Sequence, residues 1–416
     1  MMKCIHTSVI NGEIYAPASK SYTIRALAGA LLAEGYSQIV NPAICDDTKV
    51  AIGIIENLGA EVEHSLNSIK VKGGLRIKNN ILNCGESALC VRLFSAMAPL
   101  FNDGIKLEGC GTLLKRDFSD VVQSLAGFGI ECSSNQGRLP LTIRGSYHKN
   151  EIKIDCSVSS QFLSGLLFTL PKLNSDTNVI VTNLQSKPYI DLTLEILGYF
   201  GIKIYHDEFR IFKIQGNQKY LPTNIIVEGD WSNAAFILVS GAVAGSVKVH
   251  GLNIDSNQGD RKILEVLDKS GALITIDKDF IQVSKNKLDA FKYNATDTPD
   301  LFPPLVGLAV NCKGISEISG VNRLRNKESN RLDALISEFT KLGINIYFSN
   351  NTLFVEGGDI KGCEVNSHKD HRIAMALVIA GLNSEEQIKI NDSEFVSKSY
   401  PEFFNDLKKI GGQIDE

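Results

Sequence analysis

The chain has 416 residues, of which 44% are hydrophobic and 22% are charged, a balance typical of globular proteins. This length is too great for one ordinary hydrophobic core, so two domains are expected. A net charge of −4 excludes a general attraction to nucleic acid or anionic lipid, so any basic site must be a local cluster.

No apolar run approaches the about eighteen residues of a membrane span, and the first thirteen residues lack the apolar core of a signal peptide. We therefore expect a cytoplasmic protein without a membrane or nucleic-acid partner. The nine cysteines are scattered, without C-x-x-C or another metal-ligand spacing. We expect them to be reduced and mostly buried, and we expect no disulfide and no metal.

The chain begins with two strand-like segments, 3–6 and 13–16, separated by a turn at Asn11-Gly12. A polar turn at Ser19-Lys20-Ser21 then opens a helix rich in small residues. A short strand, a second helix, a glycine and a pair of strands follow. The predicted unit is therefore strand, helix, strand, helix, strand, strand.

This unit recurs along the chain. Six glycines each follow a helix and precede a strand, and they lie 70, 72, 70, 72 and 68 residues apart: Gly59, Gly129, Gly201, Gly271, Gly343 and Gly411. Glycine is favoured there because the residue that closes a helix often has a left-handed conformation. A nearly constant period indicates six copies of one structural unit.

Only five residues follow the sixth glycine, so the last unit lacks its closing strands. We expect the N-terminal strands to complete it. The predicted fold is α/β (α+β), with two similar domains of three β-α-β-α-β-β units each. One domain is continuous, 19–228, and the other combines 1–18 with 229–416. The two crossing strands would form a hinge, with the helices converging on an interdomain cleft.

Cationic residues concentrate at the polar turns before the helices, where positive charge is unfavourable unless an anion compensates it. They are Lys20, Arg25, Arg92, Lys115, Arg116, Lys187, Arg323, Arg325, Lys327, Arg331, Lys369, Arg372 and Lys398. Each alone could be an ordinary surface charge. Together they predict a small substrate with several negative charges, since arginine binds carboxylate and phosphate with two parallel hydrogen bonds.

Neutral donors and two acids accompany these cations. Ser159 and Ser160 with Gln161 suit a phosphate or a polyol, although one serine would suffice as a helix cap. Asp300 and Glu328 could each simply compensate a helix dipole. A carboxylate among lysines and arginines is, however, what proton transfer to or from a hydroxyl requires.

Six segments, in order and spanning nearly the whole chain, resemble motifs of the 5-enolpyruvylshikimate-3-phosphate synthase family. They are Ser19-Lys20-Ser21 with Arg25, Ser159-Ser160-Gln161, Ser186-Lys187-Pro188-Tyr189, Lys327-Glu328 with Arg331, Asp370-His371-Arg372 and Lys398-Ser399-Tyr400-Pro401. The resemblance implies two domains of three units each. It also implies transfer of the enolpyruvyl group of phosphoenolpyruvate to the 5-hydroxyl of shikimate 3-phosphate, without a cofactor.

The resemblance also implies roles for individual residues. Shikimate 3-phosphate would be bound by Lys20, Ser21, Arg25, Ser159, Ser160, Gln161, Ser186, Asp300 and Lys327. Phosphoenolpyruvate would be bound by Lys20, Arg116, Gln161, Arg331, Arg372 and Lys398. Asp300 would accept the proton of the 5-hydroxyl, and Glu328 with Lys20 would handle protons at the enolpyruvyl carbon. His371 would be a structural neighbour of Arg372. We expect a monomer.

Three departures from the family pattern stand out. Asp117 replaces a usual proline after Arg116, which would place an acid beside phosphoenolpyruvate, and Asn330 replaces a common aspartate, which would remove a partner of nearby cations. Ala88 stands where many members have a glycine that packs against phosphoenolpyruvate and the inhibitor glyphosate. We expect its methyl group to crowd glyphosate more than the shorter substrate.

Other functions remain open from the sequence. The sister family that transfers enolpyruvyl to UDP-N-acetylglucosamine has a similar architecture and a cysteine in the loop where this chain has Cys110. The serine and Ser-Lys-Pro-Tyr motifs argue against that function. A silent anion-binding relative would not need the two acids. RNA binding is disfavoured by the acidic pI and by the lack of a basic stripe.

Overall fold

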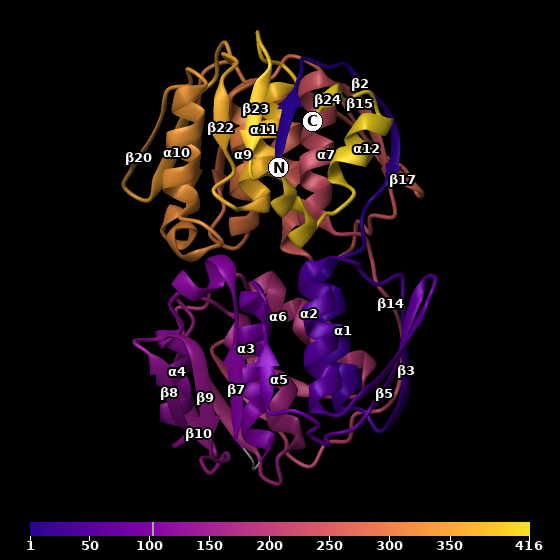
Figure 1. Ribbon diagram of the computed structural model, residues 1–416, viewed down its shortest axis with the longest axis vertical. Helices are drawn as coiled ribbons and strands as arrows, with labels where there is room; N and C mark the ends of the chain where they lie inside the picture. The colour runs from indigo at the N-terminus through magenta and orange to yellow at the C-terminus, as the bar shows by residue number, and fades with distance from the viewer. Residues whose placement is uncertain (102–103) are drawn as a thin grey trace. The chain divides into compact units, whose positions relative to one another are not determined.

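The computed structural model describes residues 1–101 and 104–416 of the chain (Figure 1). These residues form two compact units, one made of 18–227 and the other of 1–17 together with 228–416. We call them the continuous unit and the two-segment unit. Their limits lie one residue before the expected domain boundaries at both crossings. Both chain termini belong to the two-segment unit.

The continuous unit contains three four-stranded sheets of one topology. Across each sheet, the first and second strands are parallel. The third and fourth strands form a hairpin, and the third pairs antiparallel with the second. In sheet order the strands are β14 (Asn224–Ile226), β3 (Gly35–Val40), β5 (Ser68–Gly73) and β4 (Glu61–Ser65); β6 (Ile81–Asn83), β7 (Ile105–Glu108), β9 (Arg138–Arg144) and β8 (Glu131–Asn135); and β10 (Glu151–Asp155), β11 (Thr177–Thr182), β13 (Ile211–Ile214) and β12 (Ile204–Asp207).

The two-segment unit repeats this topology in three further sheets. In sheet order the strands are β2 (Ile10–Tyr15), β15 (Gly245–His250), β17 (Phe280–Ser284) and β16 (Leu273–Ile276); β18 (Lys292–Asn294), β19 (Ile315–Ser319), β21 (Thr352–Glu356) and β20 (Ile346–Ser349); and β22 (Glu364–Asn366), β23 (Ile388–Asn391), β1 (Met2–Ile5) and β24 (Ile414–Asp415). The prediction of six units on one plan is confirmed.

The placement of the N-terminal strands corrects one detail of the prediction. β1 closes the sixth sheet as expected, pairing antiparallel with β23 and β24. β2 does not join that sheet, because it pairs in parallel with β15, Ile14 opposite Val249. Likewise β14, the last strand of the continuous unit along the chain, pairs in parallel with β3, its first strand. β2 and β14 each lie directly before a crossing between the units. Each forms the edge strand of a sheet in the unit that precedes the crossing, and the other strands of that sheet are distant in sequence.

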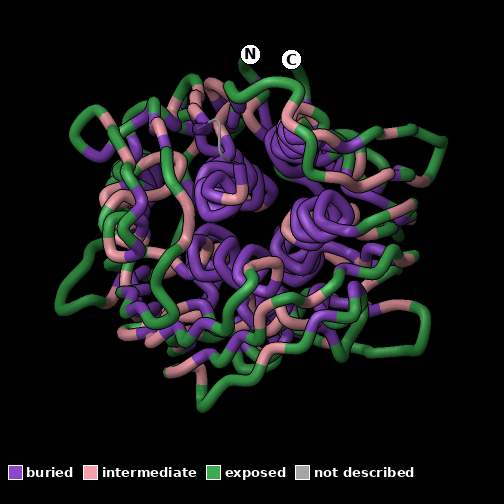
Figure 2. The backbone as a smooth tube through the Cα atoms, turned by 90° about the horizontal axis from the view of Figure 1, so that it is seen from below, coloured by how far each residue is buried: buried purple, intermediate pink, exposed green. Residues whose placement is uncertain are grey.

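Each unit is built around three inner helices that directly follow the first strands of the sheets. They are α1 (Lys20–Leu32), α3 (Ala88–Met97) and α5 (Gln161–Thr169) in the continuous unit, and α7 (Trp231–Ala244), α9 (Phe302–Ala309) and α11 (His371–Gly381) in the other. They are buried almost throughout, because apolar and small residues cover their whole circumference. Figure 2 shows buried helical turns enclosed by exposed strands and loops.

Six outer helices bury one face only. They are α2 (Asp46–Leu58), α4 (Ser119–Gly127), α6 (Lys187–Tyr199), α8 (Ile263–Lys269), α10 (Arg331–Lys341) and α12 (Phe403–Lys409). The residue or turn after each of them contains one of the six repeated glycines, and all six have a positive φ, between 79° and 126°. The predicted reason for glycine at these positions is therefore confirmed.

Short 3₁₀ helices complete the connections. They are η1 (Ala98–Leu100), η2 (Gly111–Lys115), η3 (Leu170–Lys172), η4 (Gly259–Lys262), η5 (Pro299–Leu301), η6 (Val321–Asn326) and η7 (Ser393–Lys398). Several of them lead directly into helices or turns that carry predicted site residues. These short segments therefore place several predicted site residues directly before helices.

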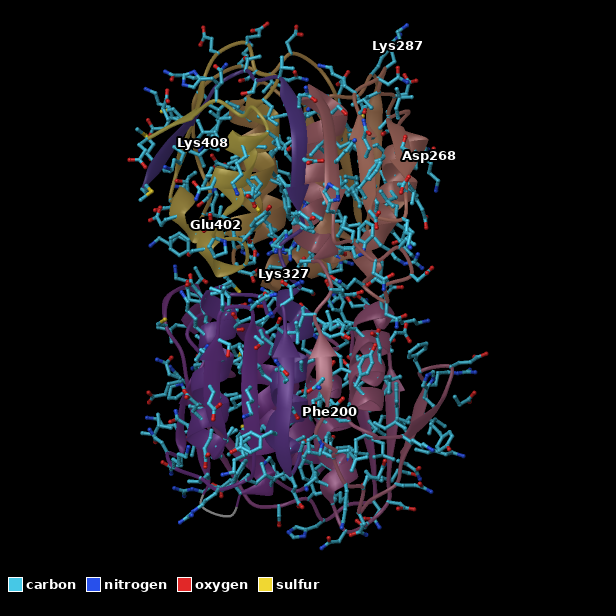
Figure 3. All side chains as sticks on the ribbon, turned by 90° about the vertical axis from the view of Figure 1, so that its right-hand side faces the viewer. Phe200, Asp268, Lys287, Lys327, Glu402 and Lys408 are labelled. Atoms are coloured by element: carbon cyan, nitrogen blue, oxygen red, sulfur yellow. The ribbon has the colours of Figure 1, made fainter. Side chains whose placement is uncertain are left out.

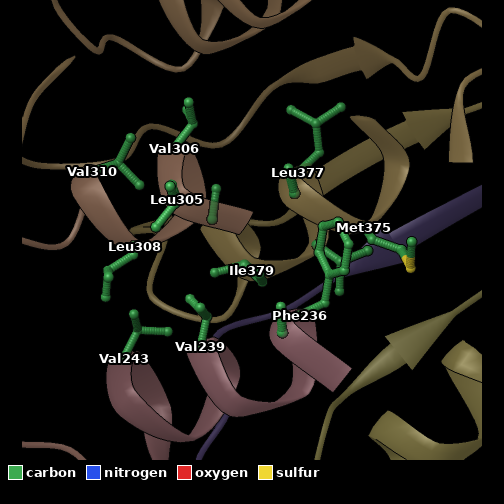
Figure 4. Packing of buried hydrophobic residues seen from close by; sticks show 14 of the residues in the cluster. Phe236, Val239, Val243, Leu305, Val306, Leu308, Val310, Met375, Leu377 and Ile379 are labelled. Atoms are coloured by element: carbon green, nitrogen blue, oxygen red, sulfur yellow. The ribbon is translucent and has the colours of Figure 1, made fainter. Parts of the chain in front are cut away.

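The core of the two-segment unit lies where its inner helices meet. Phe236 and Val239 of α7, Leu305 of α9, and Leu377 and Ile379 of α11 are among the apolar side chains that fill this region (Figure 4). The helices approach closely because α9 carries a glycine at this contact. A Cβ atom on Gly307 would lie 3.0 Å from Ile379 Cγ2.

Charged side chains are concentrated at the periphery of each unit. Asp268 and Lys287 project from the outside of the two-segment unit, whereas Phe200 lies inside the continuous unit and is fully buried (Figure 3). All nine cysteines are free thiols and six of them are buried; Cys110 is exposed. The prediction of mostly buried cysteines is confirmed.

Candidate active site

In the continuous unit, Lys20 is the first residue of α1, where Ser19 caps the helix by accepting a hydrogen bond from the Tyr22 amide at 3.4 Å. Lys20 Nζ lies 3.0 Å from Asp47 Oδ2, and both side chains are largely buried. Asp47 belongs to the first turn of α2. The inner helix and the outer helix of the first repeat thus bring a cation and an acid together.

Arg25 lies one turn further along α1 and is 1% exposed. Its Nε donates to Thr193 Oγ1 at 2.9 Å, its Nη1 to the Ser21 carbonyl at 3.0 Å, and its Nη2 to Ser164 Oγ at 3.4 Å. Burial lowers the pKa of Arg25 to about 10, so it remains charged at neutral pH. Arg25 therefore connects α1 with α5 and α6 and presents a fixed positive charge.

The predicted serines cluster at two further helix starts. Ser160 occupies the N-cap position of α5 and is buried, and Ser159 Oγ accepts a hydrogen bond from the Gln161 amide at 3.2 Å. Gln161 Oε1 is buried and has no hydrogen-bond partner among the described residues. Ser186 occupies the N-cap position of α6 in a left-handed conformation, with φ of 59°. Ordinary capping does not require this many hydroxyl and amide groups.

Arg116 directly follows η2 and is 8% exposed. Glu86 holds the start of η2 in place, because its Oε1 accepts the Thr112 amide at 2.5 Å. Asp117, one of the departures, turns its Oδ1 toward Ser119, accepting from its amide at 2.8 Å and its hydroxyl at 2.6 Å. This carboxylate therefore caps the start of α4.

In the two-segment unit, Arg331 is the first residue of α10 and is surrounded by three carboxylates. Its Nη1 lies 2.7 Å from Asp300 Oδ1, its Nη2 2.6 Å from Glu328 Oε2, and its Nε 2.8 Å from Asp370 Oδ2. Burial alone would lower the pKa of Arg331, but the three acids outweigh it and raise that pKa. Arg331 is thus a permanent charge at the centre of the cluster.

Asp300 lies in η5 and faces three cations. Besides Arg331, Arg372 Nη2 lies 3.4 Å from its Oδ2 and Lys327 Nζ lies 3.6 Å from its Oδ1. Burial would raise the pKa of Asp300, but Arg372, Lys327 and Arg331 hold it well below its usual range. Burial also lowers the pKa of Lys327 to about 8, against the opposing effect of Asp300.

Asp370 caps α11 and joins two of the predicted motifs. Its Oδ1 accepts the Arg372 amide at 3.0 Å, and its Oδ2 accepts the Ser329 hydroxyl at 3.1 Å as well as Arg331 Nε. His371 is 1% exposed, with Nδ1 3.6 Å from Asp370 Oδ1. Lys398 ends η7, which packs against α11, and is 4% exposed.

Asp260, in η4, is a further buried acid near this cluster. It is 1% exposed and accepts a hydrogen bond from the Ser232 hydroxyl through Oδ2. Burial, reinforced by the negative charge of Asp300, raises the pKa of Asp260 to about 7. Part of the population is therefore protonated at neutral pH.

The structure thus assembles the predicted residues into groups within each unit. The two-segment unit holds one connected group: Asp300, Lys327, Glu328, Arg331 and Arg372, with Lys398 on the neighbouring η7. The continuous unit holds the others at the starts of its helices: Lys20, Ser21, Arg25, Ser159, Ser160, Gln161 and Ser186, with Arg116 after η2.

Sequence reasoning missed Asp47 and Asp260 as members of these groups, and it named Asp370 within a motif without giving it a role. The role of Asp370 could have been predicted, because an acid two residues before an arginine at a helix start is a recognisable cap. Asp260 offers no such signal. The departure at Asn330 has a local explanation, since its side chain caps α10 by accepting the Asp333 amide at 3.4 Å.

In the described part of the chain, 1–101 and 104–416, no group of three or more His, Cys, Asp or Glu side chains is arranged so that it could hold a metal ion. Within those same residues, no helix is long and apolar enough to span a membrane.

Comparisons with known proteins identify the family of the chain. The family model for EPSP synthase (3-phosphoshikimate 1-carboxyvinyltransferase) matches residues 6–407. The chain is 37% identical to the 3-phosphoshikimate 1-carboxyvinyltransferase of Clostridium novyi, over 98% of this chain and 97% of that protein. It is 38% identical to the enzyme of the same name from Clostridium botulinum strain Alaska E43, over 99% of this chain and 98% of that protein.

Solved structures share the fold. An EPSP synthase from Acinetobacter baumannii superposes with a TM-score of 0.84 at 24% identity, covering 100% of this chain and 99% of that one. The enolpyruvyl transferase NikO from Streptomyces tendae gives a TM-score of 0.81 at 16% identity, covering 100% and 98%. The chain therefore belongs to the family of EPSP synthases, the 3-phosphoshikimate 1-carboxyvinyltransferases that transfer an enolpyruvyl group in the shikimate pathway.

Proposed function

We propose that the residues described above bind phosphoenolpyruvate and shikimate 3-phosphate and move the protons of the reaction. The reaction transfers the enolpyruvyl group of phosphoenolpyruvate to the 5-hydroxyl of shikimate 3-phosphate, with release of phosphate. The observation that supports this most directly is the Asp300 carboxylate held between Lys327, Arg331 and Arg372. An acid within a cationic cluster combines a proton acceptor with binding groups for anions.

Shikimate 3-phosphate is proposed to bind mainly through the continuous unit. Its phosphate suits the buried charge of Arg25 and the hydroxyls of Ser159 and Ser160, because backbone amides at the start of α5 also favour an anion. Ser21 and Ser186 add hydroxyl groups at neighbouring helix starts. The remaining proposed contacts come from Lys20, Gln161, Lys327 and Asp300.

Phosphoenolpyruvate is proposed to bind through Arg116, Arg331, Arg372 and Lys398, with Lys20 and Gln161 close to both substrates. These three arginines and Lys398 are each less than 9% exposed, and this burial strengthens their attraction to a carboxylate and a phosphate. The buried Gln161 Oε1 offers an acceptor for a substrate hydroxyl. Arginine can form two parallel hydrogen bonds with each acidic group of this substrate, the planar carboxylate and the tetrahedral phosphate.

The chemistry requires three proton movements. Protonation of the enol carbon makes the neighbouring carbon electrophilic, the 5-hydroxyl attacks it while losing a proton, and a tetrahedral adduct forms. The adduct then loses phosphate and a proton. Asp300 is proposed to take the hydroxyl proton, and Glu328 and Lys20 to handle protons at the enolpyruvyl carbon.

The low pKa of Asp300 makes it a weak base until an anion binds nearby. A substrate that occupies Arg372 or Lys327 compensates part of the positive charge that lowers this pKa. Its pKa then rises toward the range in which a carboxylate accepts a proton effectively. Substrate binding itself would therefore activate the base.

We also propose that the protein acts as a cytoplasmic monomer without a nucleic-acid partner. Nine free thiols fit a reducing compartment, and a net charge of −4 gives no general attraction to nucleic acid. Light scattering during gel filtration should give one chain mass, 45.5 kDa. Twice that mass would contradict the monomer.

The decisive experiment measures phosphate release by the purified chain given phosphoenolpyruvate and an acceptor. Release with shikimate 3-phosphate and not with UDP-N-acetylglucosamine is expected. Release only with the nucleotide sugar would assign the sister reaction, for which the exposed Cys110 would be the first residue to replace. No release with either acceptor, despite binding of shikimate 3-phosphate, would identify a silent relative.

A further inference from the structure

A buried acid that has no place in the proposed chemistry lies on α10, seven residues after Arg331. Glu338 is 1% exposed. Its Oε2 accepts the Asn366 amide at 2.9 Å and Lys341 Nζ at 2.7 Å, and its Oε1 lies 2.7 Å from His368 Nε2. Two of these three partners belong to one turn, at residues 366–370.

This turn connects β22 with α11 and has an unfavourable backbone conformation. His368 and Lys369 are both left-handed, with φ of 55° and 59°. This conformation is unfavourable for residues other than glycine, so the surrounding contacts must hold the turn in place. Internal hydrogen bonds contribute, from the His368 amide to Asn366 Oδ1 and from the Lys369 amide to Ser367 Oγ at 3.1 Å.

The hydrogen bonds within the turn stabilise its shape, whereas its contacts with α10 determine where it lies relative to that helix. At the far end of the turn, Asp370 binds Arg331 at the start of α10. At the near end, Asn366 and His368 bind Glu338, two helical turns further along. The turn is therefore fastened to one helix at two separated points, which fixes its orientation as well as its distance.

The residue whose placement depends on this attachment is Arg372. It is the second residue of α11, its amide is bound by Asp370, and its guanidinium lies 3.4 Å from Asp300. A rotation of the turn about the Asp370 contact would carry Arg372 away from Asp300. Glu338 is placed to prevent that rotation.

The charge of Glu338 suits this role. Burial would raise its pKa, but hydrogen bonds from His368, Lys341 and Asn366 outweigh burial and lower the pKa to about 2. The carboxylate is therefore ionised throughout the range in which an enzyme works. Hydrogen bonds to a charged acceptor are stronger than neutral ones.

We propose that Glu338 is a positioning residue for enolpyruvyl transfer, which fastens the turn at residues 366–370 to α10 and so places Arg372 for binding phosphoenolpyruvate. This inference rests on the proposed role of Arg372. It assigns a function to a residue that touches neither substrate.

The kinetic test compares Glu338→Ala with Glu338→Gln. The alanine variant should raise the KM for phosphoenolpyruvate about tenfold, with kcat and the KM for shikimate 3-phosphate within about twofold of the native values. The glutamine variant should stay within about threefold, because its amide oxygen still accepts the Asn366 amide. A Lys341→Ala variant is the matched control, since Lys341 binds Glu338 but not the turn, and should leave all three constants unchanged.

A second measurement does not depend on activity. Amide hydrogen exchange in residues 366–372 should be faster in Glu338→Ala than in the native chain, and unchanged in Lys341→Ala. If the native chain releases no phosphate, the proposed function fails, while the exchange rates still test the attachment of the turn. Should the alanine variant not fold, His368→Ala, which removes one of the two contacts, should give an intermediate rise in the phosphoenolpyruvate KM.

Two outcomes would overturn the proposal. One is unchanged exchange in residues 366–372 of a folded Glu338→Ala or His368→Ala variant. The other is an equal rise in both KM values, because a general loss of structure would affect both substrates alike.

Discussion

At the scale of single residues, Asp300 carries the most direct test of the proposed chemistry. Replacing it with asparagine removes the proton acceptor but keeps the size of the side chain. The rate of phosphate release should fall by about 10² to 10⁴. The thermal midpoint and the binding of shikimate 3-phosphate should be measured alongside, and a variant that retains more than a tenth of native kcat would exclude Asp300 as the base.

Asp260 should make stability depend on pH. Its pKa is about 7 in the folded chain and about 4 in the unfolded chain, so the folded state binds more protons between these values. Stability should therefore fall as pH rises from about 4 through 7. Asp260→Asn removes this pH-dependent loss. The free energy of unfolding of the variant minus that of the native chain should therefore be about 3 kcal/mol larger at pH 8 than at pH 5.

Chemical denaturation at both pH values measures this difference, because other titrating groups cancel in the comparison. Parallel stability curves for the native chain and Asp260→Asn would show that Asp260 is ionised in the folded protein at both pH values.

Ala88 is the first residue of α3 and is 6% exposed. If its methyl group crowds glyphosate, Ala88→Gly should bind this inhibitor more tightly by about 1 to 3 kcal/mol, while the KM for phosphoenolpyruvate changes little. Inhibition constants for the two proteins test this. Equal constants would mean that Ala88 does not determine the sensitivity of this enzyme.

The residue scale also shows the limit of sequence reasoning about the site. Cations at helix starts could be predicted because each lies in a local pattern of polar turn and helix. Not all of the acids that organise them could be predicted, because the partners of some are remote in sequence: Asp47 meets Lys20, and Glu338 binds the amide of Asn366. Such pairs depend on how helices pack.

At the scale of elements, the close approach of inner helices depends on glycine. A Cβ atom on Gly165 of α5 would lie 2.7 Å from the Leu93 carbonyl and 2.8 Å from Ala96 Cβ, both on α3. Gly165→Ala should therefore destabilise the protein by about 1 to 3 kcal/mol in chemical denaturation, despite the better helix propensity of alanine.

The matched control is Gly53→Ala in the middle of α2, where an added Cβ would meet nothing within 4 Å. There the gain in helix propensity should stabilise the protein by up to about 1 kcal/mol. Stabilisation by both substitutions would show that α3 and α5 can separate without cost.

The elements themselves were largely predictable, because the six glycines and the polar turns are local signals with one period. The partner of β2 was not. A strand of alternating residues indicates a sheet but not which neighbour it pairs with, and β15 lies more than two hundred residues away along the chain. Only the assembled fold shows that β2 opens the fourth sheet, whereas the closure of the sixth sheet by β1 was predicted.

At the scale of the whole molecule, the continuous unit contains every strand of its three sheets, since β14 lies within residues 18–227. A fragment of residues 18–227 should therefore fold alone and unfold in one cooperative transition, as measured by circular dichroism in denaturant. A fragment of residues 228–416 lacks β1 and β2 and should be less stable than the same residues supplied with 1–17. Equal stability would show that these strands contribute little.

The pairing of β1 with β23 and β24 also sets an order of events on the ribosome. Residues 2–5 are made long before their partners at 388–391 and 414–415. At about 5 to 20 residues per second, β1 waits roughly 20 to 80 seconds for its neighbours. During that time residues 18–227 are complete and able to fold, whereas the first strand remains an unpaired edge that a chaperone would have reason to cover.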